Sequence, residues 1–96
     1  MAILSRSELP GVAAEQIAPL ISALSEQMQS FPGFIAHASG AVPGNYQVIE
    51  VWESQEAQER WIREVLMPVL MPVLQELGVQ SPPMGQYLTL DQLIMR

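Results

Sequence analysis

The sequence predicts an α+β chain whose elements follow the order β-α-β-β-α-β. A short β-prone segment precedes an amphipathic helical stretch, two β-prone segments joined by a short loop occupy the middle, and a second helical stretch precedes a last β-prone segment. This order is the split β-α-β pattern of ferredoxin-like subunits. We therefore expect one antiparallel four-stranded sheet with two helices on one face, formed by a single domain over residues 1–96.

The first part of the chain predicts a strand over residues 2–9, after which Pro10-Gly11 breaks the pattern. Pro19 lacks the N–H that an interior helical position donates, so we expect it to kink the first turns of the following helix or to delay its start. That helix is predicted over about 13–29 by apolar residues at helical spacing, namely Ile17, Leu20, Ile21, Leu24 and Met28.

The middle of the chain predicts an antiparallel hairpin. A turn at 31–33 is followed by a strand over 34–39, a loop over 40–45 with turn residues at both ends, and a strand over 46–53 rich in aromatic and β-branched residues. If Gly40 pairs with Asn45 across the loop, His37 lies on the same face as Val48, Glu50 and Trp52. A one-residue slip of the register would separate this set.

The second helical stretch begins at Ser54, a favourable N-cap residue. The sequence Leu-Met-Pro-Val of residues 66–69 is repeated at 70–73, and two prolines four apart cannot both lie inside a straight helix without loss of backbone hydrogen bonds. We expect the helix to break near Met67 and a short helix to run from about Pro68 or Val69 to Leu77, stopped by Gly78. The repeat is interpreted as a tandem duplication that adds one turn, or as an apolar lid.

Residues 81–83 form a predicted linker, and 86–95 form the last predicted strand. In the strand over 46–53 both faces are apolar, since Val48 and Trp52 lie on one face and Ile49 and Val51 on the other. A sheet with one solvated face would alternate apolar and polar residues. We therefore expect the uncovered face to pack against a second copy of the chain in a homodimer.

Composition excludes several classes of function. The chain has ten acidic residues, four arginines and no lysine, and its net charge of -6 argues against binding to nucleic acid or to an anionic membrane surface. Without lysine or cysteine it has no Schiff-base, thiolate or zinc-thiolate chemistry. One histidine with scattered carboxylates predicts no metal site, and no phosphate-binding or dinucleotide-binding motif is present, so no cofactor is expected.

The sequence begins with no signal-peptide pattern and contains no apolar run of membrane-spanning length, so we expect a cytoplasmic location.

Three segments resemble the antibiotic-biosynthesis-monooxygenase family of dimeric α/β barrels: residues 31–35, Pro43-Gly44 and 51–54, the last two joined by the β-prone run. Pro10-Gly11 and the Leu-Met-Pro-Val-Leu stretch are also similar. The resemblance implies a dimeric α/β barrel. The family includes cofactor-independent oxygenases of aromatic polyketides, haem-degrading enzymes and quinol oxygenases, so the fold by itself assigns no reaction.

In haem-degrading relatives the tryptophan that matches Trp52 lines the substrate pocket, and a histidine on the second helix binds haem. The matching position here is Ile62, and the asparagine of their first strand has no match in 2–9. Haem binding is therefore not expected. Trp52 is predicted either to form a pocket wall against a flat aromatic substrate or to be a core residue that fixes the hairpin to the second helix.

Two further residues are candidates for catalysis. His37, the only histidine, suits a general base that deprotonates a phenol or an activated carbon acid, and its alternative role is that of a hydrogen-bonded structural residue. Glu50 lies in the middle of a strand that looks buried, where it needs a raised pKa or a partner such as His37. It would form either a polar pocket wall or an interface hydrogen bond.

The candidates for substrate binding are Tyr46, Asn45 and Tyr87, which could orient a phenolic or quinone substrate or could simply end strands and turns. Arg63 would pair with Glu59 on the helix surface, or would turn inward and hold an anionic substrate.

Together with these residues, the resemblance implies a cofactor-independent monooxygenase that acts on an aromatic or polycyclic molecule such as a phenol, a hydroxyanthrone or a quinol. A base in a closed apolar pocket, with His37 and Trp52 on its wall, would deprotonate the substrate, and the electron-rich anion would reduce O2 directly. The alternatives are a non-catalytic dimer that binds a small molecule and a non-oxidative cyclase or isomerase that uses the same pocket.

Overall fold

A computed structural model of the chain describes residues 2–78 and 84–95. The strands are β1 (Ile3–Pro10), β2 (Phe34–Val42), β3 (Asn45–Trp52) and β4 (Met84–Thr89). The helical segments are α1 (Ala14–Ser30), α2 (Gln55–Trp61), the π-helical segment η1 (Ile62–Leu66) and α3 (Met67–Glu76).

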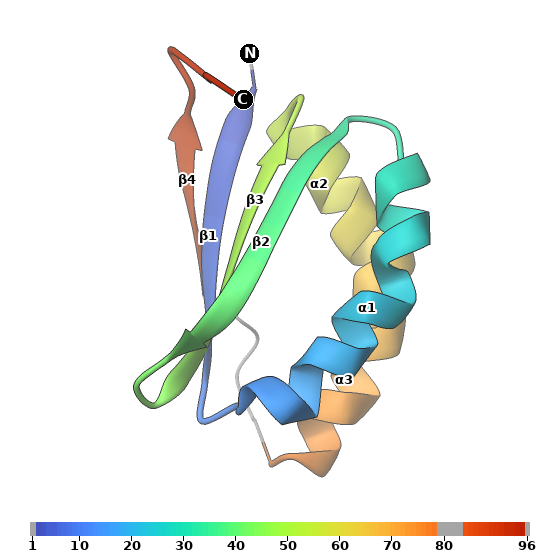
Figure 1. Ribbon diagram of the computed structural model, residues 1–96. Coiled ribbons are helices and arrows are strands. Elements are labelled where there is room, and N and C mark those ends of the chain that lie inside the picture. The colour runs from blue at the N-terminus through green and yellow to red at the C-terminus, as the bar shows by residue number, and fades with distance from the viewer. Residues whose placement is uncertain (1, 79–83, 96) are drawn as a thin grey trace.

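The four strands form one sheet in the order β2-β3-β1-β4, and every neighbouring pair is antiparallel. The helices α1, α2 and α3 lie on one side of this sheet, and the opposite face carries no helix of the described chain (Figure 1). The predicted ferredoxin-like α+β fold is therefore confirmed. None of the helices in the described ranges is long and apolar enough to cross a membrane.

The hairpin is longer and tighter than predicted. Its strands continue to Val42 and Asn45, which pair directly, so only Pro43 and Gly44 connect them. Gly44 has φ 78°, a conformation that glycine adopts without the steric penalty of a side chain. A proline followed by such a glycine suits a tight turn.

The expected pairing of Gly40 with Asn45 is wrong by two residues, because Gly40 pairs with Gln47 and His37 pairs with Glu50. Side chains of a strand alternate between faces with a period of two. A shift of two residues therefore moves each pair along the strands but leaves every side chain on its predicted face.

The expected break of the second helix near Met67 is also wrong. The helix continues through η1, where the Met67 N–H donates to the Ile62 carbonyl oxygen five residues earlier. Pro68, the second residue of α3, directly follows this wider turn, and Pro72 lies inside the same helix. Both prolines thus lie within one continuous helical arm. Helix α3 ends as predicted before Gly78, which has φ 76°.

Two other boundaries differ from expectation. Pro19 lies inside α1 and does not delay its start at Ala14. Strand β4 begins at Met84 and ends at Thr89, so the prediction of strand structure as far as residue 95 is wrong; after Thr89 the Leu90 N–H still donates to the Ala2 carbonyl oxygen at 2.9 Å. The predicted linker at 81–83 lies outside the described residues.

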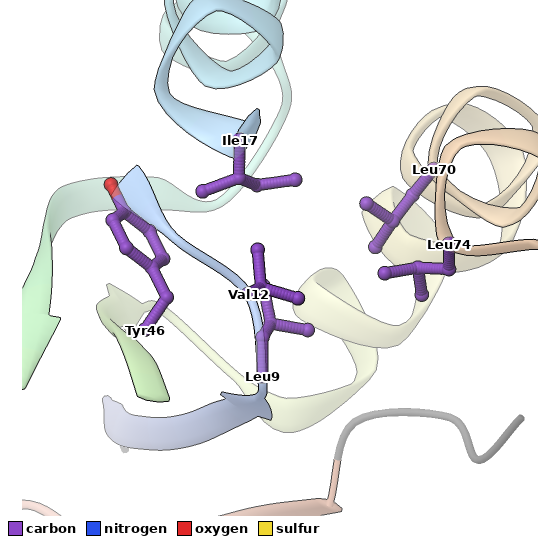
Figure 2. Packing of buried hydrophobic residues seen from close by; sticks show 6 residues of the cluster. All are labelled: Leu9, Val12, Ile17, Tyr46, Leu70 and Leu74. Atoms are coloured by element: carbon purple, nitrogen blue, oxygen red, sulfur yellow. The ribbon is translucent and has the colours of Figure 1, made fainter. Parts of the chain in front are cut away.

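Buried side chains form two clusters between the sheet and the helices. Figure 2 shows the first, in which side chains from β1, the turn after it, α1, β3 and α3 meet: Leu9, Val12, Ile17, Tyr46, Leu70 and Leu74. The second contains Ile3, Leu24, Met28, Trp52 and Trp61. The two tryptophans are fully buried, and Phe31 packs edge-on against both of them.

Candidate functional site

A row of side chains crosses the helix-facing side of the sheet. The strand register places His37 of β2 opposite Glu50 of β3, Glu50 opposite Ser5 of β1, and Ser5 opposite Tyr87 of β4. Gln58 of α2 reaches this row from the helix layer, since its Nε2 donates to Ser5 Oγ at 2.6 Å and to Glu50 Oε1 at 3.1 Å. The fold thus places five polar side chains between a sheet and its helices.

Glu50 is the centre of the row. Its Oε2 lies 2.7 Å from His37 Nδ1, and its Oε1 accepts hydrogen bonds from Trp52 Nε1 at 2.9 Å and from Gln58 Nε2. Burial by itself raises the pKa of this carboxyl, but the hydrogen bonds from His37 and Trp52, the charge of His37 and the bond from Gln58 together outweigh it. The pKa of Glu50 consequently lies below its ordinary value, and the group is ionised at neutral pH.

An ionised carboxylate can only accept hydrogen bonds, so His37 Nδ1 must carry the hydrogen that it shares with Glu50. In the neutral ring the lone pair is then on Nε2, which lies 3.1 Å from Ser39 Oγ. The Tyr46 hydroxyl donates to the same Ser39 oxygen at 2.9 Å, which leaves the Ser39 hydrogen available for Nε2. The arrangement holds His37 in the tautomer of a general base.

A mostly apolar cavity of about 240 Å³ lies over this row, between the sheet and the helices. Its sheet side includes the row residues His37, Glu50 and Tyr87, next to the small residues Ser7 and Gly85. The remaining wall comes from α1 and from the arm α2-η1-α3, and apart from Gln58 it is apolar: Ile17, Leu20, Ile21, Leu24, Met28, Ile62, Leu66, Met67 and Leu70.

An open groove runs between α1 and the edge strand β2, beside the cavity. Ile21, Met28 and His37 line both spaces, so these side chains form the boundary between them. His37 can therefore be approached both from the cavity and from the groove, and its side chain is 15% exposed.

Three predicted residues line the cavity: His37, Glu50 and Tyr87. Tyr87 is 44% exposed at the β4 edge. Partial burial, followed by the charges of Glu59 and Glu50, raises the pKa of its phenol above the ordinary value, so the hydroxyl keeps its proton and can donate a hydrogen bond.

Trp52 does not form the predicted pocket wall. It is fully buried in the second cluster, where Phe31, Phe34 and Trp61 surround it. The reason is that Trp52 ends β3 next to the start of α2, beyond the row that carries the cavity. Its contact with the site is the hydrogen bond from Nε1 to Glu50, which fits the alternative role of a core residue.

The other three predicted substrate-binding residues also lie away from the cavity wall. Tyr46 is buried in the first cluster and reaches the row only through Ser39. Asn45 lies at the hairpin turn opposite Pro10, at the far end of β3 from Trp52. Arg63 has a side chain that is 68% exposed and lies 3.8 Å from Glu64, so neither the inward position nor the pair with Glu59 is present.

Sequence reasoning missed four polar residues of the site: Ser5, Ser7, Ser39 and Gln58. Gln58 did carry a signal, because helical spacing places this polar residue on the same side of the helix as the apolar residues Trp61 and Ile62, three and four positions later. Ser5 carried none, because the strand over 3–10 has polar residues on both faces. Ser39 ends the predicted strand over 34–39, a position at which a serine gives no signal of a role in a site.

Comparison with known proteins supports the fold. No protein-family model matches the chain, and no curated protein matches it in sequence. Among solved structures, the NE2512 protein of unknown function from Nitrosomonas europaea has a TM-score of 0.79 and 13% identity, with 99% of this chain and 94% of that chain covered. A candidate antibiotic biosynthesis monooxygenase from Caulobacter crescentus has a TM-score of 0.70 and 17% identity, with 95% and 91% covered.

SnoaB, a cofactor-independent oxygenase from Streptomyces nogalater, has a TM-score of 0.62 and 17% identity, with 99% of this chain and 97% of that chain covered. Over nearly its whole length, the chain therefore has the fold of antibiotic-biosynthesis-monooxygenase structures. At these identities the likeness establishes the fold alone.

Proposed function

We propose that this chain is a cofactor-independent oxygenase that oxidises an aromatic small molecule bearing an acidic hydroxyl group. The observation that carries the proposal is the His37–Glu50 pair on the wall of an apolar cavity. His37 Nδ1 lies 2.7 Å from Oε2 of the buried Glu50 carboxylate, and this contact fixes the tautomer of the histidine base. Solved structures with this fold include a cofactor-independent oxygenase, which agrees with the proposal.

In the proposed reaction His37 Nε2 takes the proton of the substrate hydroxyl, and the Glu50 carboxylate stabilises the imidazolium that forms. The Ser39 hydroxyl, at hydrogen-bond distance from Nε2, either passes this proton on or gives way to the substrate. The apolar wall removes water from the anion, which keeps it electron-rich.

The ring carbon para to the oxygen then attacks O2 and forms a C–O bond. The peroxide takes back the proton from the His37 imidazolium, and the hydroperoxide then loses water together with the hydrogen of the same ring carbon, which leaves a quinone. One oxygen atom of O2 enters the product and the other enters water, so the substrate itself supplies all four electrons and no external reductant is needed.

The test is O2 uptake with a panel of phenols, naphthols, quinols and hydroxyanthrones, together with identification of the quinone. We expect His37→Ala to lower the rate by about 10²–10⁴-fold, the usual contribution of a general base. The control is Glu53→Gln, because Glu53 is an exposed carboxylate at the end of the same hairpin. Binding of panel members with no O2 uptake by the wild type, but with rearranged product, would favour the cyclase or isomerase alternative; binding alone would favour a non-catalytic binding protein.

We further propose that the chain forms a homodimer through the face of the sheet opposite the helices. The strand register places Ala36, Val51, Leu4 and Leu88 in one row on this face, and Ile49 lies in the next. Leu88 is 59% exposed and Ile49 37% exposed in the isolated chain. A second copy would cover this apolar end and complete an α/β barrel.

A further inference from the structure

We propose that the cavity selects uncharged hydroxyarenes of one or two rings, with the hydroxyl at His37 and the rings against the helices. This inference rests on the proposed function, because it names the substrate class of the same site. Three properties of the cavity carry it: its volume, the charges of the residues that line it, and the distribution of its polar groups.

The volume limits the number of rings. The cavity measures about 240 Å³, whereas a protein cavity of about 150 Å³ holds one benzene molecule. If the volume needed is proportional to the number of ring carbons, about 150 Å³ for the six carbons of benzene predicts that the observed volume holds about ten carbons. Ten carbons make two fused rings. Three fused rings, with fourteen carbons, would need about 350 Å³ on the same scale.

The charges exclude an anionic substituent. Among the described residues, no arginine lines the cavity, and the chain has no lysine. Arg60 and Arg63 have side chains that are 48% and 68% exposed on the outside of the helix arm. A buried carboxylate or sulfonate would therefore meet Glu50 without a counter-charge. The anion made by proton transfer differs, because the same step creates the imidazolium of His37 beside it.

The polar groups set the orientation. His37, Glu50, Ser7 and Tyr87 all belong to the sheet side of the cavity, and Gln58 is bonded to that side. The side formed by α1 is entirely apolar. A ligand with its hydroxyl on one edge matches this division, whereas a polar group on the opposite edge would be buried without a partner.

The test measures binding to the full chain under nitrogen, where turnover is impossible, by isothermal titration calorimetry with phenol, 1-naphthol, 1-anthrol and a hydroxynaphthoate. We expect 1-naphthol to bind at least tenfold more tightly than phenol, because the second ring buries more apolar surface. We expect 1-anthrol and the hydroxynaphthoate to bind at least tenfold more weakly than 1-naphthol.

A variant on the sheet side tests the location. A Cβ at Gly85 would lie 3.4 Å from Ser7 Oγ and meets no closer atom, so Gly85→Val fits the strand and fills cavity space. We expect it to weaken 1-naphthol at least tenfold and phenol less than threefold. The control is Gln27→Val, at an exposed position of α1 that lines neither the cavity nor the groove.

Binding of 1-anthrol as tight as that of 1-naphthol, for instance by extension into the groove, would overturn the size limit, and equal binding of the hydroxynaphthoate would overturn the charge rule. Failure of every hydroxyarene to bind would overturn the whole inference. The predicted order of affinities without O2 uptake in air would leave the substrate class standing and refute the oxygenase. Oxidation of the three-ring substrate would support the oxygenase and refute the proposed limit of two rings.

Discussion

Replacement of Glu50 by glutamine changes one atom of the site and reverses the role of His37. The amide oxygen can still accept from Trp52 Nε1 and Gln58 Nε2, which both bond Oε1 in the native chain. The amide nitrogen then takes the place of Oε2, 2.7 Å from His37 Nδ1. Two donors cannot face each other at this distance, so the ring must move its hydrogen to Nε2 and accept at Nδ1.

The cost in stability follows from the three hydrogen bonds. A bond to a charged group contributes about 1.5–3 kcal/mol and a neutral bond about 0.5–1.5 kcal/mol, so each bond loses about 1 kcal/mol when the charge is removed. Part of this loss is offset, because a neutral amide costs less to bury than a carboxylate. We therefore expect Glu50→Gln to lower the free energy of unfolding by about 1–3 kcal/mol.

The assay has two parts. Urea unfolding followed by tryptophan fluorescence gives the change in stability, and ¹⁵N–¹H correlation spectra of the single imidazole give its tautomer. Glu53→Gln is the matched control, because it makes the same chemical change at an exposed position and should alter neither quantity. An unchanged stability together with a retained Nδ1–H in Glu50→Gln would refute the hydrogen-bond assignment.

The stability difference should also depend on pH. The pKa of Glu50 is lowered from 4.5 in the folded chain, so the folded state favours the ionised form. Its contribution is fully present above that ordinary value and is lost as the pH falls through the lower folded value. The advantage of wild type over Glu50→Gln should therefore shrink as the pH falls below about 4.5. An advantage that grew on acidification would contradict the sign of the shift.

Three further predictions concern packing and assembly. Trp52→Phe should destabilise the chain by about 1 kcal/mol more than Trp61→Phe in urea unfolding. The reason is that Trp52 Nε1 donates to Glu50, whereas Trp61 Nε1 has no partner among the described residues. Equal losses of stability would argue against the bond from Trp52 to Glu50. Gly33→Ala should destabilise more than Gly44→Ala, because both glycines have positive φ but only at Gly33 would a Cβ lie 2.6 Å from Ala57 Cβ; Ala57→Gly should rescue part of the difference in thermal unfolding. Light scattering after size-exclusion chromatography should find a dimer that Ile49→Lys converts to monomer and that Gln27→Lys, on exposed α1, leaves intact; a monomeric wild type would refute the proposed assembly.

The element order and the faces of the strands were predictable because both depend on local spacing. Helical and strand periods, the Ser54 cap and the glycine after α3 act over a few residues, and the Ser54 side chain does accept from the Ala57 N–H. The sharing of one face by His37 and Glu50 was predictable even from a wrong register, because only the parity of the position decides the face.

Features set by distant segments were not predictable. The path of the chain through Pro68 depends on whether the preceding turn widens to a π-helical one, as it does over Ile62–Leu66. Trp52 was expected at the pocket, but the aromatic residues Phe31, Phe34 and Trp61 come from three other segments and enclose it.

The sequence by itself thus determined the α+β fold and the sharing of one face of the sheet by His37, Glu50 and Trp52. Only the tertiary structure decided that His37 lies directly opposite Glu50, that Gln58 and Ser5 complete the row from segments 53 residues apart, and that a cavity remains above them. The physical reason is range. Side-chain direction follows from the local backbone, whereas contacts across strands and between layers depend on where the whole chain brings those side chains together.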